Sequence, residues 1–472
     1  MSSNVDIARA PAFQGRVPQL LIVITTLGLV LTGYFSPLAL GIFAAVVVFV
    51  LAACGFRPLL WTIIFFLPVA PYLNWAFPVK DLATLLRFAF FAGTIAYARR
   101  ERIDIRQLLF AGGLTWALIA YLSIAILSAL AFNQGTGAAA RELMRLGSYL
   151  CFYYSINALI ETDDQFNRAF KALMLSSICV ALFGLYQFLL GDYSAVYHAL
   201  YPFQDEAQKA PEWSGRITSF LGHFNSLAGY LNLQIPLFIA LALRASNQSV
   251  RRLARLALAL SGIALVLTQS RGALLATVVI LLLAAWLLAP TLRLRIRWLM
   301  AMTAIGVVAA ILLGLMFQRL SGIDDYTEVT RLAVWAGACS VFAGSPVMGI
   351  GFGNLRSVLA SFIDLPDDFI IDAHNLYLEL LAETGIVGFL IFALLIFVAL
   401  RRAWRLLRDR HDELNPIVGF AALAAVIGVL VHGGVDYMFH TSPQFSAMFF
   451  LILGLLNAAE RRHTPIRDRC TG

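Results

Sequence analysis

Apolar residues occupy this chain in long unbroken runs, and short polar stretches separate one run from the next. A run of about 20 apolar residues is long enough to cross a bilayer as a helix. Membrane-spanning strands would instead alternate apolar and polar positions over about ten residues. The continuous runs therefore predict an all-α fold, a polytopic helical bundle integral to a membrane.

The candidate spans are numerous, although several are shorter than the usual length of about 17 to 25 residues. They lie at 18–34, 37–54, 58–72, 82–98, 108–132, 143–160, 169–190, 220–243, 253–268, 273–289, 298–317, 376–400, 417–431 and 445–458. Some short pairs are equally compatible with re-entrant or interfacial helices. We therefore expect about 12 to 14 transmembrane helices.

Arginines in the short polar stretches predict the orientation of the bundle. They gather at 99–106, 244–255, 293–297, 401–410 and in the tail at 461–469. An even number of predicted spans separates each group from the next, so all lie on one side, and the positive-inside rule assigns that side to the cytoplasm. We expect a bacterial inner-membrane protein with both termini in the cytoplasm. The opposite side, facing the periplasm, would carry 191–217, 269–272, 318–375 and 432–443.

Composition supports this class of protein. Hydrophobic residues make up 60% of the chain and charged residues 13%, and the mean hydropathy is +0.80. The net charge of +8 comes from arginines in short loops, which favours a role in topology over nucleic-acid binding. The five cysteines are scattered and show no metal-binding or disulfide spacing.

The largest interruption of the apolar pattern lies late in the chain and suggests three parts. Residues 1–317 form the N-terminal transmembrane helices, 318–375 a periplasmic loop domain, and 376–472 the C-terminal transmembrane helices and cytoplasmic tail. Within the loop domain, apolar residues at helical spacing predict two amphipathic helices, at 327–342 and 355–362. These helices would cover a cavity at the membrane face as a lid. The next span starts near Asn375 and is expected to continue without a break.

Arg271 stands in a tight turn between two apolar runs, Gln269-Ser270-Arg271-Gly272. A charge within apolar helices costs about 2.5 to 3.5 kcal/mol at the bilayer centre and less near the interface, so it needs a partner or an anion. A snorkelling topology anchor is the alternative. Anchoring arginines belong on the cytoplasmic side, however, and this turn is predicted to face outward. We therefore predict that Arg271 binds substrate.

Arg216 and Arg331 also lie in outward segments, although either alone is equally compatible with a solvated surface residue. Together with Arg271 they would form a cationic pocket, and planar guanidinium groups suit the oxygens of a diphosphate. The outward acidic pairs at 324–325 and 367–368 are explained by loop solvation. We therefore predict no metal site and no cofactor.

His374 is the candidate general base, because a neutral imidazole titrates near working pH and can accept a proton from an attacking hydroxyl. A histidine that packs at a helix start is the alternative. Its position beside Asn375, on the same interruption as Arg331, favours the base. Glu379 and Glu383 follow at a spacing of four residues and would orient His374 or an arginine, or favour the helix N-terminus. The other outward histidines are expected to be structural: His223, His432 and His440.

Four motifs from residue 216 to residue 389 resemble the O-antigen ligase and polymerase superfamily of bacterial envelope glycosyltransferases, and O-antigen ligase most. They are RITSFLGHFNSLAGYL, TQSRGALLA, TRLAVW with SPVMGIGFGNL, and AHNLYLELLAETGIVGF. The resemblance implies a metal-independent enzyme of the outer leaflet. It would transfer a glycan from undecaprenyl diphosphate to an acceptor hydroxyl, which in the ligases belongs to the lipid A-core oligosaccharide.

The resemblance also implies roles for particular residues. Arg271 and Arg331 would hold the diphosphate, and His374 would activate the acceptor. Arg216 matches a more variable position of the family. The implied partners are the lipid-linked glycan donor, the lipid A-core acceptor and membrane lipid, with no nucleic acid. Direct displacement at the anomeric carbon, assisted by one base, would invert its configuration.

Several other functions share part of this pattern. A repeat-unit polymerase and a protein O-oligosaccharyltransferase use the same donor chemistry with other acceptors, and the single large outward interruption late in the chain favours the ligase. A small-anion transporter is a candidate of another class. It should carry polar residues or broken helices at mid-membrane, whereas the predicted spans are nearly free of charge apart from Arg87 and Arg145. This favours a surface enzyme.

Overall fold

The computed structural model describes most of the chain from residue 56 to residue 462. The described ranges are 56–69, 82–101, 103–110, 112–132, 136–191, 215–289, 324–359, 361–363, 372–409 and 411–462, with a few positions between 291 and 300. Every regular element in these ranges is a helix. The predicted all-α fold is therefore confirmed.

Several of the described helices have the length and apolar character of membrane spans, and there are seven of them. They are α7 (Gly113–Ala131), α9 (Asp163–Leu190), α11 (Phe224–Arg244), α13 (Arg271–Leu288), α17 (Leu376–Leu407), α18 (Leu414–His432) and α19 (Pro443–Arg461). The predicted polytopic membrane bundle is thus confirmed. The spans predicted at 18–34 and 37–54, and nearly all of 298–317, lie outside the described residues, so the total of about 12 to 14 stays a prediction.

The remaining described helices are shorter or carry more charge. They are α3 (Phe56–Phe66), η1 (Leu67–Val69), α5 (Leu82–Arg100), α6 (Ile105–Phe110), α8 (Thr136–Leu159), η2 (Ser219–Leu221), α12 (Gln248–Leu267), α15 (Asp324–Gly344) and α16 (Leu355–Leu359). Of these, α5, α8 and α12 overlap predicted spans. Charged residues interrupt their apolar sequences, for example Arg87 in α5 and Arg145 in α8.

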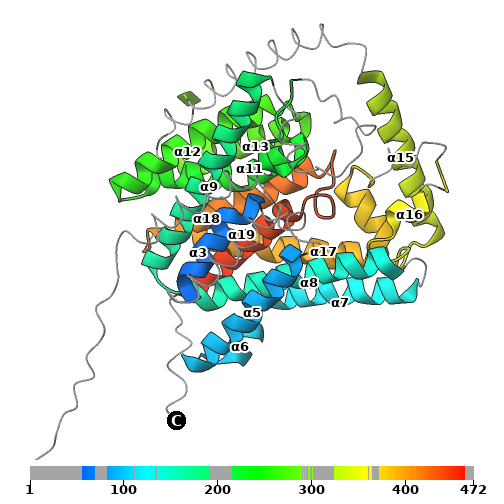
Figure 1. Ribbon diagram of the computed structural model, residues 1–472, viewed down its shortest axis with the longest axis horizontal. Coiled ribbons are helices and arrows are strands. Elements are labelled where there is room, and N and C mark those ends of the chain that lie inside the picture. The colour runs from blue at the N-terminus through cyan, green and yellow to red at the C-terminus, as the bar shows by residue number, and fades with distance from the viewer. Residues whose placement is uncertain are drawn as a thin grey trace, which may run out of the picture.

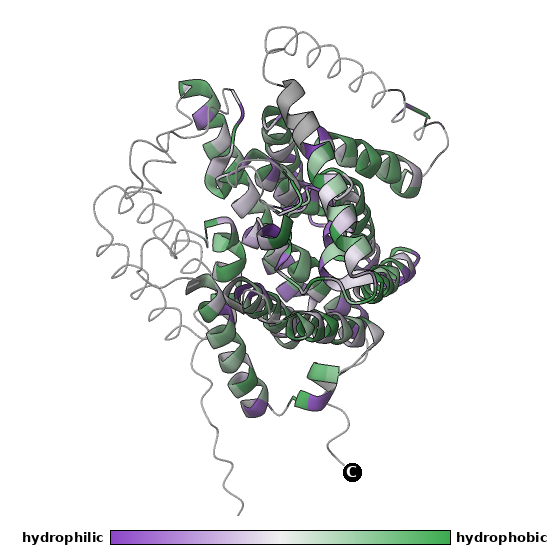
Figure 2. Cartoon of the chain, turned by 90° about the vertical axis from the view of Figure 1, so that its right-hand side faces the viewer, coloured by the Kyte–Doolittle hydropathy of each residue, from purple (hydrophilic) through white to green (hydrophobic). Residues whose placement is uncertain are grey.

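Three helices form the centre of the bundle: α11, α18 and α19. In their most apolar stretches, 94%, 83% and 89% of the residues, respectively, are buried. Around them, α17 packs against α18 and α7, α13 against α18, α12 against α9, and α8 against α19 (Figure 1). Hydrophobic residues, coloured green in Figure 2, make up much of the described helices. Large apolar residues such as Leu130, Leu189 and Trp286 remain exposed on outer helices, as expected for surfaces that face lipid.

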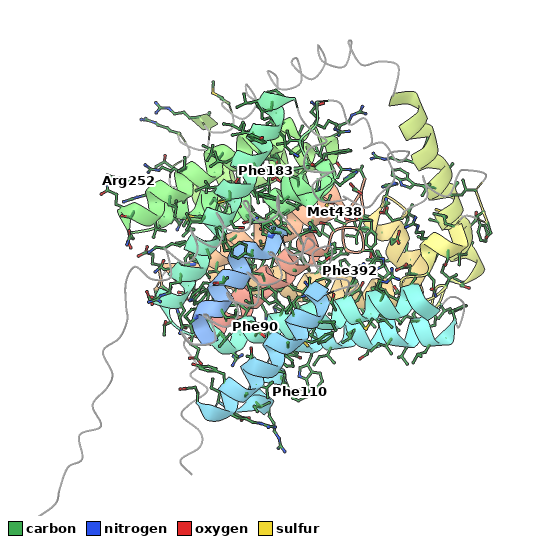
Figure 3. The ribbon with its side chains drawn as sticks, viewed as in Figure 1. Phe90, Phe110, Phe183, Arg252, Phe392 and Met438 are labelled. Carbon is green, nitrogen blue, oxygen red and sulfur yellow. The ribbon has the colours of Figure 1, made fainter. Side chains whose placement is uncertain are left out.

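The connection between α18 and α19, residues 433–442, folds back into the bundle. Met438 of this connection and Phe392 of α17 are both 5% exposed, and they lie inside the bundle in Figure 3, whereas Phe110 lies at its periphery. A Cβ added to Gly229 of α11 would come within 2.3 Å of Met438 Sδ. The α18–α19 connection is therefore held by the central helices.

Helix α17 is broken at Gly385, where φ is 64° and ψ is −169°. Only glycine adopts this conformation without strain. The prediction that the span starting near Asn375 continues without a break was wrong at this residue. The 22 residues from 386 to 407 still suffice to cross a bilayer, so the break lies near one end of the bundle.

A glycine-rich turn at 345–354 fills the break. Its amides donate to carbonyls that the broken helix leaves open: Ile350 N to Ala382 O at 2.9 Å and Gly351 N to Glu383 O at 3.0 Å. A Cβ on Gly385 would lie 2.2 Å from Val347 O. The turn and the break therefore fit only because glycine allows the two backbones to approach, and they satisfy each other's hydrogen bonds.

Helices α15 and α16 lie at the same end of the bundle, at the right in Figure 1. They pack against each other and against α17. A small apolar cluster joins them to the start of α17; its buried members are Val334, Ala338, Val341, Leu355, Leu359, Ala373 and Ala382. The division of the chain at 318 and 375 stays a prediction.

Candidate functional site

The segment that leads into α17 is fixed at both sides of His374. Before it, Ala373 N donates to Glu379 Oε2 at 2.6 Å, and the two residues after it are also held. The Asn375 side chain caps the helix by accepting from Tyr377 N at 3.0 Å and Leu378 N at 3.1 Å. Leu376 N also donates to Gly433 O at 2.7 Å in the α18–α19 connection. Between these anchors, the backbone of His374 has a positive φ of 47°, which is uncommon outside glycine. The candidate base thus lies on a constrained backbone.

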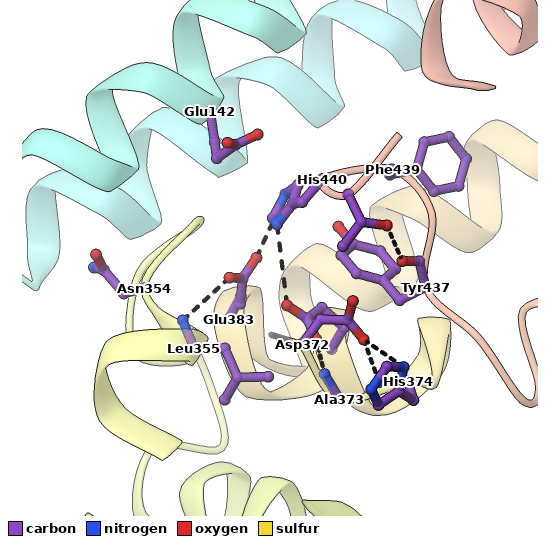
Figure 4. Close-up of polar contacts among 12 residues, drawn as sticks. Glu142, Asn354, Leu355, Asp372, Ala373, His374, Glu383, Tyr437, Phe439 and His440 are labelled. Carbon is purple, nitrogen blue, oxygen red and sulfur yellow. Dashed lines mark hydrogen bonds and ion pairs between the residues drawn. The ribbon is translucent and has the colours of Figure 1, made fainter. Parts of the chain in front are cut away.

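The imidazole of His374 lies between two buried carboxylates. Its Nδ1 is 3.4 Å from Asp372 Oδ1 and 3.6 Å from Asp436 Oδ1, and Figure 4 shows the contact with Asp372. The carboxylates are held by backbone amides: His374 N donates to Asp372 at 2.5 Å and Tyr437 N to Asp436 at 2.8 Å. Both acidic groups face the Nδ1 side of the ring, so Nε2 points away from them.

The carboxylates change the acid–base properties of the ring. Burial lowers the pKa of His374, but its polar contact with Asp436 and the charges of Asp372 and Asp436 more than offset this, so the net pKa is raised. Burial raises the pKa of Asp372 to about 6, against the opposing charge of His374. Burial also acts to raise the pKa of Asp436, but His374, His432 and His223 lower it below its usual value. Asp436 is therefore the firmly ionised partner of His374.

Arg331 supplies a positive charge close to this group. It lies on α15, half-buried, and its charge acts to lower the pKa of both His374 and Asp372. Within the described part of the chain, the side chain of Arg331 makes no hydrogen bond or ion pair. Its guanidinium is therefore near the imidazole and has its donors available to a ligand.

Arg271 begins α13, exposed at the end of the bundle. The residue after it packs tightly on the α18–α19 region: a Cβ on Gly272 would lie 2.4 Å from Val435 Cγ2 and 2.8 Å from His432 Cδ2. The turn that carries Arg271 therefore rests on the same short segment that positions Asp436.

Arg216 braces that turn from the other side. Its Nε donates to Thr268 O at 3.1 Å and one terminal nitrogen to Gln269 O at 2.8 Å. The guanidinium also stacks on the Phe224 ring, 3.4 Å from its centroid. These contacts hold the backbone just before Arg271, and they use part of the donor capacity of Arg216.

His223 lies where these segments meet. Its Nδ1 accepts from Asn225 N at 3.2 Å, which caps α11. Burial lowers its pKa to about 4, and the charges of Asp436, Arg216, His374 and Arg331 all act on it. The segments that carry Arg216, Arg331, His374 and Asp436 thus lie near one another although they are far apart in sequence. The Gly272 contact joins the Arg271 turn to the α18–α19 region. Substrate binding by the three arginines stays a prediction.

Sequence reasoning missed Asp372 and Asp436. Asp372 precedes His374 by two residues, and Asp436 stands in a short glycine-containing connection between two apolar runs. A carboxylate in such a position is costly without a partner, and that cost is the signal that could have found Asp436. Its partner is 62 residues earlier in the chain, which no local pattern reveals.

Glu379 and Glu383 do not contact the His374 ring directly. Glu379 Oε2 accepts from Ala373 N at 2.6 Å, and Glu383 Oε1 accepts from Leu355 N at 3.2 Å. The two glutamates therefore brace the backbone on either side of the site, and both face His440. Figure 4 shows the contact of His440 with Glu383. His440, expected to be structural from the sequence, thus stands between two buried acids.

Two groups of side chains have ligand atoms close enough for one cation, all within 4.8 Å in each group. They are Asp372 with His374 and Asp436, and Glu379 with Glu383 and His440. The prediction of no metal site did not consider these two groups, because their carboxylates come together only in the fold. It stays a prediction.

Comparison with known families assigns part of the chain. Residues 256–393 match the family described as O-antigen ligase. The match supports assignment of this segment to the O-antigen ligase superfamily. The superfamily consists of glycosyltransferase-like membrane enzymes, and its match here includes Arg271, Arg331 and His374. Arg216 and Asp436 lie outside the matched residues. No curated protein matches the chain.

Proposed function

We propose that this protein is an O-antigen ligase, which transfers a glycan from undecaprenyl diphosphate to a hydroxyl of the lipid A-core oligosaccharide. The observation that supports this most is an imidazole backed by two buried carboxylates, at 3.4 and 3.6 Å, beside the arginine of an O-antigen ligase domain. The site would face the periplasm of a bacterial inner membrane. The acceptor is part of the proposal, since the sites of polymerases and protein O-oligosaccharyltransferases need the same donor chemistry.

The proposed step begins at His374 Nε2, which takes the proton of the acceptor hydroxyl. Asp436 and Asp372 keep the Nδ1 side in place and stabilise the imidazolium that forms. The acceptor oxygen forms its new bond to the anomeric carbon as the bond from that carbon to the diphosphate oxygen breaks. The electron pair of the broken bond leaves with the diphosphate.

Arginines would stabilise the charge that develops on the leaving diphosphate. Arg331 and Arg271 offer guanidinium forks to its oxygens, and Arg216 holds the turn that presents Arg271. These positive charges do the work of charge neutralisation in the proposed step, without a metal. A single displacement from the face opposite the diphosphate predicts inversion at the anomeric carbon. A product that retains the configuration of the donor would refute this displacement.

The broken helix does not favour a transporter. Its break at Gly385 is filled by the backbone of the glycine-rich turn, and 22 residues remain to cross the membrane beyond it. A transporter would need such a break to line a substrate path near mid-membrane. The geometry therefore supports chemistry at one end of the bundle.

Deleting the gene and separating lipopolysaccharide on a gel tests the proposed function. Loss of the long-chain ladder, with polymer accumulating on the undecaprenyl carrier, is the expected result. A band with a single repeat unit would identify a polymerase instead. An unchanged ladder, with loss of a glycosylated protein, would identify a protein O-oligosaccharyltransferase.

Complementing the deletion with His374→Ala tests the assigned base. We expect no restoration of the ladder by a protein that inserts at the wild-type level, because no other described group replaces Nε2. His411→Ala changes an exposed histidine on another loop and should restore the ladder fully. Full restoration by His374→Ala would show that His374 is not the base.

A further inference from the structure

A second imidazole lies between two acids on the far side of Ala373 from His374. His440 Nδ1 is 4.0 Å from Glu379 Oε1, and His440 Nε2 is 3.9 Å from Glu383 Oε2. Glu379 and Glu383 are only 2% and 1% exposed. Figure 4 shows His440, on the α18–α19 connection, pointing toward Glu383.

Two atoms that face each other in this group lack partners. Glu383 Oε2 and His440 Nε2 are buried and have no hydrogen bond within the described chain. The distance of 3.9 Å between them is too long for a hydrogen bond, which needs about 2.7 to 3.2 Å. It is also short for a bridging water, whose two hydrogen bonds would span roughly 4.5 Å.

Such a separation fits two ligands of one cation. Metal-to-ligand distances of about 2.0 to 2.2 Å place two ligand atoms up to roughly 4 Å apart. One ligand atom from each of Glu379, Glu383 and His440 already lies within 4.8 Å of the others. Small rotations of these side chains would bring the three atoms onto a common centre.

The charge of the group also calls for a cation. Two carboxylates are buried side by side, and leaving them ionised without a counter-charge is costly. Among the described residues, His440 lies within 4.0 Å of both carboxylates. A neutral imidazole nitrogen of His440 would complete the ligand set beside the two carboxylates.

We propose that Glu379, Glu383 and His440 hold a divalent first-row transition cation of the zinc class. An imidazole nitrogen favours such a cation over calcium or magnesium, which prefer oxygen ligands alone. The second oxygens of the glutamates keep their bonds to Ala373 N and Leu355 N, which orients the ligating oxygens. The proposed role of the cation is structural, because the acids that contact the His374 ring are Asp372 and Asp436 and not the proposed ligands.

The cation would fasten three pieces of the site together. His440 belongs to the α18–α19 connection that carries Asp436, Glu379 holds the amide next to His374, and Glu383 holds the glycine-rich turn. Metal binding would therefore stabilise the geometry of the base without entering the transfer step.

Metal analysis of the full-length protein in detergent tests this site. Purified wild-type protein is expected to carry about one zinc per chain. After removal of the metal with a chelator, Zn²⁺ alone should raise the melting temperature of the wild type. Zinc binding should be at least about 100-fold weaker in each of three variants: Glu383→Gln, Glu379→Gln and His440→Gln. This exceeds the loss of about 10- to 100-fold that is typical of residues that contact the metal ligands but not the metal.

Glu379→Gln and Glu383→Gln keep an oxygen that can accept from the same amides, so these two variants are expected to fold. Glu413→Gln and His411→Gln change exposed residues on another loop; they are controls outside the group, and both should retain zinc. Wild-type protein that binds no zinc, or variants that bind it as the wild type does, would overturn the proposal and leave the acids neutralised by protons. Because the readout is metal content, this outcome is independent of whether the protein is a ligase.

Discussion

Replacing Asp436 with Asn tests the partnership of His374 with its acids. At an effective dielectric constant of about 20, unit charges 3.6 Å apart attract by roughly 4 to 5 kcal/mol. This value limits how much imidazolium stabilisation the substitution can remove, and corresponds to about a 10³-fold change in rate. Asp372 remains 3.4 Å from the same nitrogen. We therefore expect a smaller loss of kcat/KM, about 100-fold.

The pH dependence gives the decisive readout. Asp436 raises the pKa of His374, so its loss should move the midpoint of the rate–pH curve to lower pH while lowering the plateau. The assay follows glycan transfer by purified protein from a lipid-linked donor to lipid A-core between pH 5 and 9. Asp164→Asn removes an exposed carboxylate on α9 and should leave both quantities unchanged. An Asp436→Asn protein with the wild-type rate and midpoint would refute the proposed pairing.

Other substitutions and conditions probe the rest of the site. Arg331→Ala and Arg271→Ala should each lower kcat/KM by about 10- to 100-fold, because a charge-assisted hydrogen bond to phosphate contributes about 1.5 to 3 kcal/mol. Arg331→Lys should recover only part of the lost activity. An Ala variant as active as the wild type would exclude the contact. Gly385→Ala should destabilise the fold by about 1 to 3 kcal/mol or more, seen as a lower melting temperature, because its Cβ would meet Val347 O at 2.2 Å; an unchanged melting temperature would contradict this. The pKa of His374 is raised in the folded state, so this residue contributes stability below its unfolded pKa of about 6.5, and the contribution is lost as the pH rises through the folded-state pKa. The melting temperature should therefore fall above about pH 6.5. His374→Ala should remove this part of the pH dependence of the melting temperature.

Local patterns in the sequence were sufficient for the helices and for several of their ends. Apolar runs predicted the membrane bundle, because lipid leaves a buried backbone few alternatives to helix. Asn375 before α17 and Ser442-Pro443 before α19 are ordinary cap signals, and both caps are present. The break at Gly385 was missed because a single glycine within an apolar run carries no local sign of the turn that will dock there.

The candidate site was predictable only in part. Arg271 was proposed because a charge beside apolar helices needs a partner or an anion, and His374 because a neutral imidazole can accept a proton. Their roles, and those of Arg216 and Arg331, stay predictions. Asp436 was missed because its value depends on a contact with a residue 62 positions away. His440 was read as structural since the burial of Glu379 and Glu383 against it becomes visible only in the packed fold.

The α18–α19 connection departs from the usual freedom of surface loops. Gly433 O binds Leu376 N, Gly434 O binds the Asn375 side chain, Asp436 faces His374, and His440 faces two glutamates. Loops commonly tolerate insertions and deletions. Here four of eight consecutive residues, 433 to 440, each make a separate contact. One added or removed residue would therefore displace some of these residues from their partners. Homologous chains that keep this chemistry should therefore vary the identity of its residues long before they vary its length.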